Sequence, residues 1–171
     1  MIPALAVAAR NLKSAMVDNT EIIIRKAEMD DAKAIAELHK KVVTEINSES
    51  YSPEAIEEWA KDISEENVLY QLQNSDWIIA EADDKLVGFG QYSVADGEIY
   101  QINVDPNFLK KKIGKKLYDY MESKFRGAVR EKISLNATLN AVGFYQKLGF
   151  VEIQEIHMGL IKMIKMEKSL R

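Results

Sequence analysis

The sequence contains no cysteine, which excludes disulfide bonds, a thiolate nucleophile and any zinc site with cysteine ligands. It has only two histidines, His39 and His157, and they stand far apart in the chain. His39 flanks an apolar stripe and His157 lies near a turn, so both are expected to be ordinary surface or half-buried histidines. This scarcity argues against a histidine-based metal site and against a serine-type catalytic triad, and we expect no bound metal.

The chain also lacks a long hydrophobic run. The longest one near its start is IPALAVAA, eight residues and too short to span a bilayer. No basic residue precedes this run, which makes it a poor secretory signal. We therefore expect a cytoplasmic protein without membrane contact. Residues 1–20 are expected to be an appendage that packs on the domain, packs on a second copy in a homodimer, or frays.

Neither sign of charge dominates, because 23 basic residues stand against 27 acidic ones, a net charge of −4. The protein is therefore not a general binder of polyanions. A chain of 171 residues, of which 47% are apolar, is long enough for one domain with a buried core.

Residue patterns predict strands that alternate with helices. The predicted strands are EIIIRKA (21–27), DWIIAEA (76–82), KLVGFGQYSV (85–94), EIYQINV (98–104), KISLN (132–136), FVEIQEI (150–156) and GLIKMIKM (159–166). The predicted helices cover 30–46, a segment opened by Ser52 and Pro53, 64–74, a segment opened near Ile113, and 138–148 stopped by Gly149. Asp83 and Asp84 are expected to join two of the strands as a hairpin. This order predicts a single α/β domain, residues 21–171, with a mixed sheet.

The segment NFLKKKIGKKL (107–117) concentrates positive charge where a helix is predicted to begin. Its lysines are Lys110, Lys111, Lys112, Lys115 and Lys116. A helix N-terminus already carries partial positive charge, so these lysines become favourable when a polyanion such as a diphosphate docks there. The alternative is a solvated lysine-rich surface. Nucleic acid is disfavoured as a partner, because the patch is short, the rest of the chain is acidic and no aromatic residues are interleaved with the lysines.

Two segments resemble motifs of the GNAT superfamily of acetyl-CoA-dependent N-acetyltransferases, and the likeness extends over roughly residues 21–167. VDPNFLKKKIGKKL (104–117) resembles the acetyl-CoA signature V-x-P-x-[YF]-[RQ]-x-x-G-x-[GA]-x-x-L, with matches at Val104, Pro106, Phe108, Gly114 and Leu117. It departs from the signature at Leu109 and at Lys112, where the family has arginine or glutamine and glycine. TLNAVGFYQKLGF (138–150) is similar to N-x-x-A-x-x-[FL]-Y-x-K-x-GF, with matches at Ala141, Phe144, Tyr145, Lys147, Gly149 and Phe150.

The resemblance implies a mixed, mostly antiparallel sheet flanked by helices, with the central strands 98–104 and 132–136 splayed to form a cofactor cleft. The backbone of 102–104 would hold the acetyl group and the pantetheine arm, and the loop 109–115 would wrap the pyrophosphate. The positive charge of the lysines at 110–112 would offset the loss of a polar side chain at Leu109 and of the family glycine at Lys112. The implied cofactor-binding residues are Ile102, Asn103, Val104, Leu109, Lys110, Lys111, Lys112, Ile113, Gly114, Lys115, Thr138, Asn140 and Lys147.

Two residues are candidates for the chemistry. Strand alternation would place Glu98, Tyr100, Ile102 and Val104 on one face, which makes Glu98 the only carboxylate on the cleft side of that strand. The position of Glu98 resembles that of a general-base glutamate in the family; the alternative is an idle glutamate at a strand end. Tyr145 matches the family tyrosine that donates to the coenzyme A sulfur; the alternative is a core aromatic.

Together these features predict an N-acetyltransferase that moves an acetyl group from acetyl-CoA to a primary amine by direct attack, without a covalent enzyme intermediate. The amine is a small molecule or a peptide, and the sequence leaves its identity open. A catalytically silent acyl-CoA-binding or regulatory module is the alternative, suggested by Leu109 and Lys112. A nucleic-acid-binding domain is a more distant third.

Overall fold

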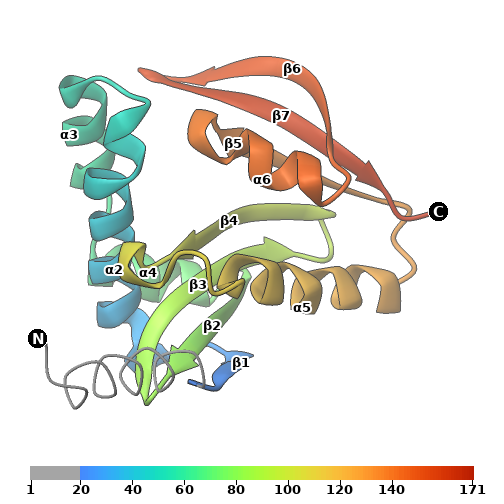
Figure 1. Ribbon diagram of the computed structural model, residues 1–171, viewed down its shortest axis with the longest axis horizontal. Helices are drawn as coiled ribbons and strands as arrows, with labels where there is room; N and C mark the ends of the chain where they lie inside the picture. Colours follow the sequence, from blue (N-terminus) through green and yellow to red (C-terminus); the bar gives the residue numbers. More distant parts are fainter. Residues whose placement is uncertain (1–19) are drawn as a thin grey trace, which may run out of the picture.

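The computed structural model describes residues 20–171, and the predicted appendage lies, but for its last residue, outside the described residues (Figure 1). Its seven strands form one sheet in the order β1-β2-β3-β4-β5-β7-β6. Every neighbouring pair is antiparallel except β4 and β5, so the expected mixed, mostly antiparallel sheet is confirmed. The strands are β1 (Ile22–Lys26), β2 (Asp76–Ala82), β3 (Lys85–Ser93), β4 (Glu98–Val104), β5 (Lys132–Thr138), β6 (Val151–Met158) and β7 (Ile161–Ser169).

Helices cover both faces of the sheet (Figure 1). They are α2 (Ala32–Glu45), α3 (Pro53–Lys61), α4 (Glu65–Leu72), α5 (Ile113–Gly127) and α6 (Val142–Lys147). Serine caps begin two of them, since Ser52 Oγ accepts from the Ala55 amide (3.2 Å) and Ser64 Oγ from the Asn67 amide (3.1 Å). In residues 20–171 none of these helices combines the length and the apolar character needed to cross a bilayer.

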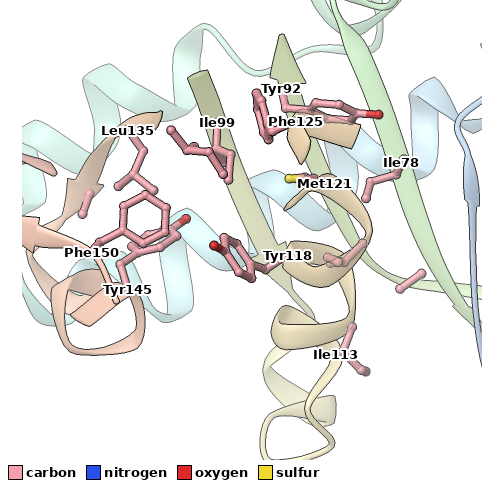
Figure 2. Close-up of a cluster of buried hydrophobic side chains, with 14 of the residues drawn as sticks. Ile78, Tyr92, Ile99, Ile113, Tyr118, Met121, Phe125, Leu135, Tyr145 and Phe150 are labelled. Carbon is pink, nitrogen blue, oxygen red and sulfur yellow. The ribbon is translucent and has the colours of Figure 1, made fainter. Parts of the chain in front are cut away.

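Two hydrophobic clusters hold the helices against the sheet. Neighbouring side chains on β2 point to opposite faces of the sheet. Ile78 lies in the cluster beneath α5 and α6, and Ile79 lies in the cluster beneath α2–α4. Figure 2 shows the first cluster, in which Met121 of α5 and Leu135 of β5 are almost fully buried. The sheet is therefore enclosed between two helical layers.

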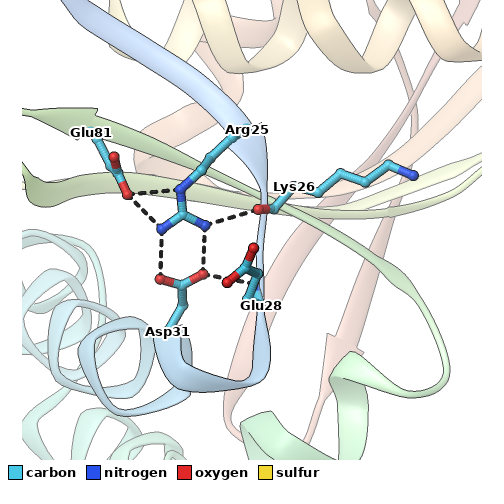
Figure 3. Close-up of polar contacts among 5 residues, drawn as sticks. All are labelled: Arg25, Lys26, Glu28, Asp31 and Glu81. Carbon is cyan, nitrogen blue, oxygen red and sulfur yellow. Dashed lines mark hydrogen bonds and ion pairs between the residues drawn. The ribbon is translucent and has the colours of Figure 1, made fainter.

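An ion-pair cluster holds the N-terminus of α2 in place (Figure 3). Arg25 on β1 donates through Nε to Glu81 Oε1 on β2 (2.8 Å), and its terminal nitrogens donate to both carboxylate oxygens of Asp31 (2.8 and 2.9 Å). Asp31 immediately precedes α2. The planar guanidinium thus connects β1, β2 and the start of α2 through directional hydrogen bonds.

Turn residues confirm the predicted hairpin and helix stop. Asp83 and Asp84 join β2 to β3 with φ of 50° and 60°, the left-handed conformation that tight hairpin turns require. Gly149 follows α6 with φ of 97°, as a left-handed cap does. The predicted start of that helix was wrong, because Thr138 still belongs to β5 and a 3₁₀ turn (Leu139–Ala141) precedes α6.

The parallel strands β4 and β5 pair over only two positions, Glu98 with Ser134 and Ile99 with Leu135. Beyond Ile99 the two strands separate. The sheet is thereby split into a half built from β1–β4 and a half built from β5, β7 and β6, as the family resemblance led us to expect.

The predicted alternation along β4 is wrong because a bulge interrupts it. Ile99 pairs with Tyr92 and Gln101 with Gln91, so Tyr100 is an extra residue. After the bulge Ile102 packs in the same cluster as Ile99. Val104 also joins this cluster, and the Gln101 and Asn103 side chains hydrogen-bond to each other away from it. Ile102 and Val104 thus face the core under α5 and do not share a face with Glu98.

Candidate active site

The separation of β4 from β5 opens a cleft of about 810 Å³. One wall is β4 and the other is formed by the end of β5 with α6, while α2, α3 and the turn after α2 close it from the second helical layer. Lining residues from that layer are His39, Val42, Ile46, Asn47, Trp59 and Gln71. Lining residues from the β5–α6 wall are Asn136, Ala137, Thr138, Asn140, Ala141, Phe144 and Tyr145.

The predicted site residues divide into two groups. Those that line the cleft are Glu98, Ile102, Asn103, Val104, Leu109, Gly114, Thr138, Asn140 and Tyr145. Those that do not are Lys110, Lys111, Lys112, Ile113, Lys115 and Lys147. The Ile113 side chain is buried in the core. Lys147 is exposed on α6, and Lys115 is paired with Asp119 one helical turn further on (2.7 Å).

Backbone amides in the first turn of α5 lie beside this cleft and have no hydrogen-bond partner among residues 20–171. Lys112 stands at the N-cap in the left-handed conformation, with φ of 57° and ψ of 24°, and its side chain makes no capping hydrogen bond. The amide of Lys116 is the first to bond back to it (3.0 Å), so the preceding amides of the helix have no partner within the helix. Backbone amides at a helix N-terminus favour an anion.

Gly114 lets this turn approach the opposite wall. A Cβ added to it would lie 3.3 Å from two ring carbons of Phe144 on α6. The glycine therefore permits close contact between α5 and α6 at the point where the cleft ends.

Tyr145 is both a core aromatic and a cleft residue. Its ring packs edge-on against Phe144 and Phe150, with centroids 5.1 and 5.6 Å apart. Burial raises the pKa of its phenol well above the ordinary value, so the hydroxyl keeps its proton at neutral pH. Within residues 20–171 no hydrogen bond engages this hydroxyl. The two interpretations of Tyr145 offered by the sequence are therefore compatible.

Glu98 lies half-buried at the start of β4 and lines the cleft. Burial raises its pKa, the nearby Asp96 carboxylate raises it further, and Lys165 lowers it in part. A carboxylate with a raised pKa holds a proton more readily, which suits a proton acceptor working near neutral pH. Among the described residues the Glu98 carboxylate has no hydrogen-bond or ion-pair partner.

A chain of amide side chains runs along the floor of the cleft, and sequence reasoning missed it. Asn103 donates to Gln101 (2.8 Å), Gln101 to Gln91 (2.9 Å), and Gln91 to Ser75 Oγ (2.9 Å). Ser75 in turn donates to the Gln71 carbonyl (3.1 Å). All the donors point the same way, so the bonds polarise one another and hold the floor rigid. The signal in the sequence was the presence of Gln91 and Gln101 within strands that are otherwise largely apolar.

His39 also faces the cleft, from α2. Its ring meets Phe89 edge-on at 5.8 Å, and burial lowers its pKa to about 4, so it is neutral at physiological pH. The sequence signal was its place on the same helical face as Ile35 and Val42. Across residues 20–171 no group of three or more histidine, aspartate or glutamate side chains could hold a metal ion.

Tyr51, in the segment between α2 and α3, bonds to the second half of the sheet and to the turn after β5. Its hydroxyl donates to the Lys162 carbonyl on β7 (2.6 Å) and accepts from the Leu139 amide (3.1 Å). Nearby, Asn140 donates to Asn47 (3.3 Å). These bonds attach the segment between α2 and α3 to the second half of the sheet.

Comparison with known proteins agrees with this geometry. Residues 47–170 match the model of the acetyltransferase (GNAT) domain, and the chain belongs to this family of acyltransferases. No curated protein matches the chain in sequence.

Solved structures share the fold. A GCN5-related N-acetyltransferase from Rhodopseudomonas palustris superposes with a TM-score of 0.82 at 24% identity, over 86% of this chain and 95% of the other. The PaiA N-acetyltransferase from Thermoplasma acidophilum, solved in complex with coenzyme A, superposes with a TM-score of 0.73 at 27% identity, over 87% of this chain and 99% of the other. YncA from Salmonella typhimurium, solved with its cofactor acetyl-CoA, superposes with a TM-score of 0.65 at 17% identity, over 88% of this chain and 94% of the other.

Proposed function

We propose that the protein is an N-acetyltransferase that moves the acetyl group of acetyl-CoA directly to a primary amine. The observation that carries this proposal is the cleft itself. Beyond Ile99 and Leu135 the two central strands part, and Glu98 and Tyr145 line the space between them beside the open N-terminus of α5. In this proposal Glu98 is the base, Tyr145 is the acid and the start of α5 is the turn that binds the anion.

The residues of the cleft fit the proposed co-substrate. The unpartnered amides at the start of α5 suit the pyrophosphate, and the exposed Lys110 and Lys112 add positive charge beside it. The backbone of 102–104, freed from pairing with β5, suits the amide-rich pantetheine arm. When bound, acetyl-CoA supplies an acetyl group activated as a thioester.

Two side chains manage the protons. Glu98 accepts a proton from the bound ammonium, which leaves a neutral amine able to attack the acetyl carbonyl. A carbon–nitrogen bond forms and the carbon–sulfur bond breaks. Tyr145, held protonated by burial, donates its proton to the departing sulfur. The nitrogen that attacked then loses its extra proton to the Tyr145 oxygen, and Glu98 releases its proton to solvent, so the products are a neutral amide and a free thiol.

We assign this activity to residues 21–171 of a cytoplasmic protein, acting on a small-molecule or peptide amine. Release of free thiol from acetyl-CoA, measured with a panel of primary amines, tests the proposal. At least one amine should accelerate release and be recovered as its N-acetyl product. Saturable binding of acetyl-CoA with no acceptor in the panel would instead favour a silent acyl-CoA-binding module.

A further inference from the structure

A second cavity, of about 330 Å³, adjoins the cleft on the face of β5, β7 and β6 that lies opposite α6. It shares Glu98 and Asn136 with the cleft, so it extends the space in which an acceptor would sit. Its lining residues are Glu98, Ser134, Asn136, Gln154, Ile156 and Lys165.

Three hydrogen-bond donors form a row across this half of the sheet. Lys165 on β7 is the register partner of Asn136 on β5 and of Gln154 on β6, so the three side chains stand next to one another on one face. Within residues 20–171 none of the three makes a hydrogen bond or an ion pair through its side chain. An ammonium group flanked by two amides is a donor set suited to a carboxylate.

Glu98 and Lys165 carry opposite charges into the same cavity without touching. Each is half-buried, and Lys165 lowers the pKa of Glu98 in part, yet they form no ion pair within 4.0 Å. Desolvated charges of opposite sign are stabilised by a partner that supplies the matching charge at each end. A ligand with an ammonium toward Glu98 and a carboxylate toward Lys165 meets that requirement.

From this arrangement we infer that the acceptor is an amino carboxylate, a small zwitterion such as a free amino acid. Its carboxylate binds the row formed by Lys165, Asn136 and Gln154, and its amine lies at Glu98, at the entrance to the cleft. The inference deepens the proposed function and rests on it for the identity of the reaction, but it concerns binding and can be measured without turnover.

The test uses calorimetry on the protein with and without coenzyme A, which carries no acetyl group and allows no reaction. The ligands are glycine, β-alanine, 4-aminobutanoate and leucine, each compared with the amine that lacks its carboxylate. At least one amino carboxylate should bind about tenfold or more tightly than its matched amine, as expected for a charge-assisted carboxylate contact.

In Lys165→Met, and in Lys165→Gln as a second variant, the ratio of the two affinities should fall close to one. Lys162→Met is the matched control, because Lys162 lies on the same strand but pairs with Glu155 on the opposite face (2.8 Å), and it should keep the preference. Equal binding of every matched pair by the wild type, or an unchanged preference in both Lys165 variants, would overturn the inference. Zwitterion binding that depends on Lys165, without thiol release, would leave the binding site standing and refute the proposed function.

Discussion

Ile99 and Leu135 form the last register pair between β4 and β5, and both side chains are buried in the cluster beneath α5 and α6. The two halves of the sheet therefore separate immediately beyond a packed hydrophobic contact. Other contacts join elements packed on the first half of the sheet to the second half. Tyr51 does so on one side, and on the other Lys168 of β7 bonds to Glu122 of α5 (2.8 Å).

Removing the carboxylate from this second bridge should destabilise the fold in a pH-dependent way. Burial alone would raise the pKa of Glu122, but hydrogen bonds from Lys168, Tyr118 and Arg126 outweigh it and lower the pKa to about 2. Because the folded-state pKa is depressed, the stabilisation is full above the pKa of the unfolded chain and is lost as pH falls from there toward 2. Glu122→Gln should cost about 2 kcal/mol of unfolding free energy at neutral pH and progressively less in acid.

Urea denaturation of Glu122→Gln at several pH values measures this loss. Glu131→Gln is a suitable control, since Glu131 pairs with Arg171 on the exposed surface and should contribute under about 1 kcal/mol. A cost for Glu122→Gln that is the same at every pH would mean that packing, and not the ion pair, provides the stabilisation.

Tyr145→Phe should separate catalysis from stability. The change removes only a hydroxyl that has no protein partner in residues 20–171, so the melting temperature should hardly move. If this hydroxyl protonates the departing thiolate, turnover should fall by about 10²-fold or more while the affinity for acetyl-CoA stays the same.

Tyr118→Phe provides the opposite control. The Tyr118 hydroxyl accepts from Lys168 (2.9 Å) and lies outside the cleft lining, so its loss should lower stability without lowering turnover. Unimpaired turnover in Tyr145→Phe would show that Tyr145 contributes only to packing.

Glu98→Gln should alter the pH profile of the reaction. Glu98 acts as a base only when ionised, so the wild-type rate should rise with pH through a pKa that burial and Asp96 raise above the usual glutamate value. The variant should turn over slowly and lack this acidic limb, with acetyl-CoA binding intact. Steady-state rates across the acidic and neutral range provide the measurement, and an unchanged limb would assign proton removal to another group or to solvent.

Lys112→Gly should stabilise the protein. Lys112 adopts a left-handed conformation with φ of 57°, which costs a residue with a Cβ about 1 kcal/mol and costs glycine little. Thermal denaturation should therefore show a higher melting temperature. Lys116→Gly, within the right-handed turn of α5, should instead destabilise the helix by roughly 1 kcal/mol. A loss of stability in Lys112→Gly would show that the lysine side chain contributes more than the backbone strain removes.

The fold was accessible from the sequence because local patterns agree with one another. The helical stripe of α5 and the Ser52–Pro53 start of α3 specify their elements without reference to distant parts of the chain. The motifs of residues 104–117 and 138–150 then indicated how those elements assemble.

Parts of the site were not accessible, because they depend on contacts between distant segments. The bulge at Tyr100 arises from pairing with β3, and it reverses the faces that simple alternation assigns to Ile102 and Val104. The chain from Asn103 to Ser75 joins residues on several elements, and the pairing of Lys165 with Asn136 exists only once β5 and β7 are neighbours. No local period encodes such contacts.

Acetyl-CoA is expected to occupy the cleft between β4 and β5 with its phosphates at the start of α5. Titration of isotopically labelled protein with acetyl-CoA, followed through backbone amide chemical shifts, reports on both places at once. Saturable shifts are expected for Ile102, Asn103 and Val104 and for the amides from Lys112 to Lys115, and pantetheine without the nucleotide should move only the first group. Shifts confined to other surfaces, or no shifts at saturating acetyl-CoA, would mean that the cofactor does not bind in this cleft.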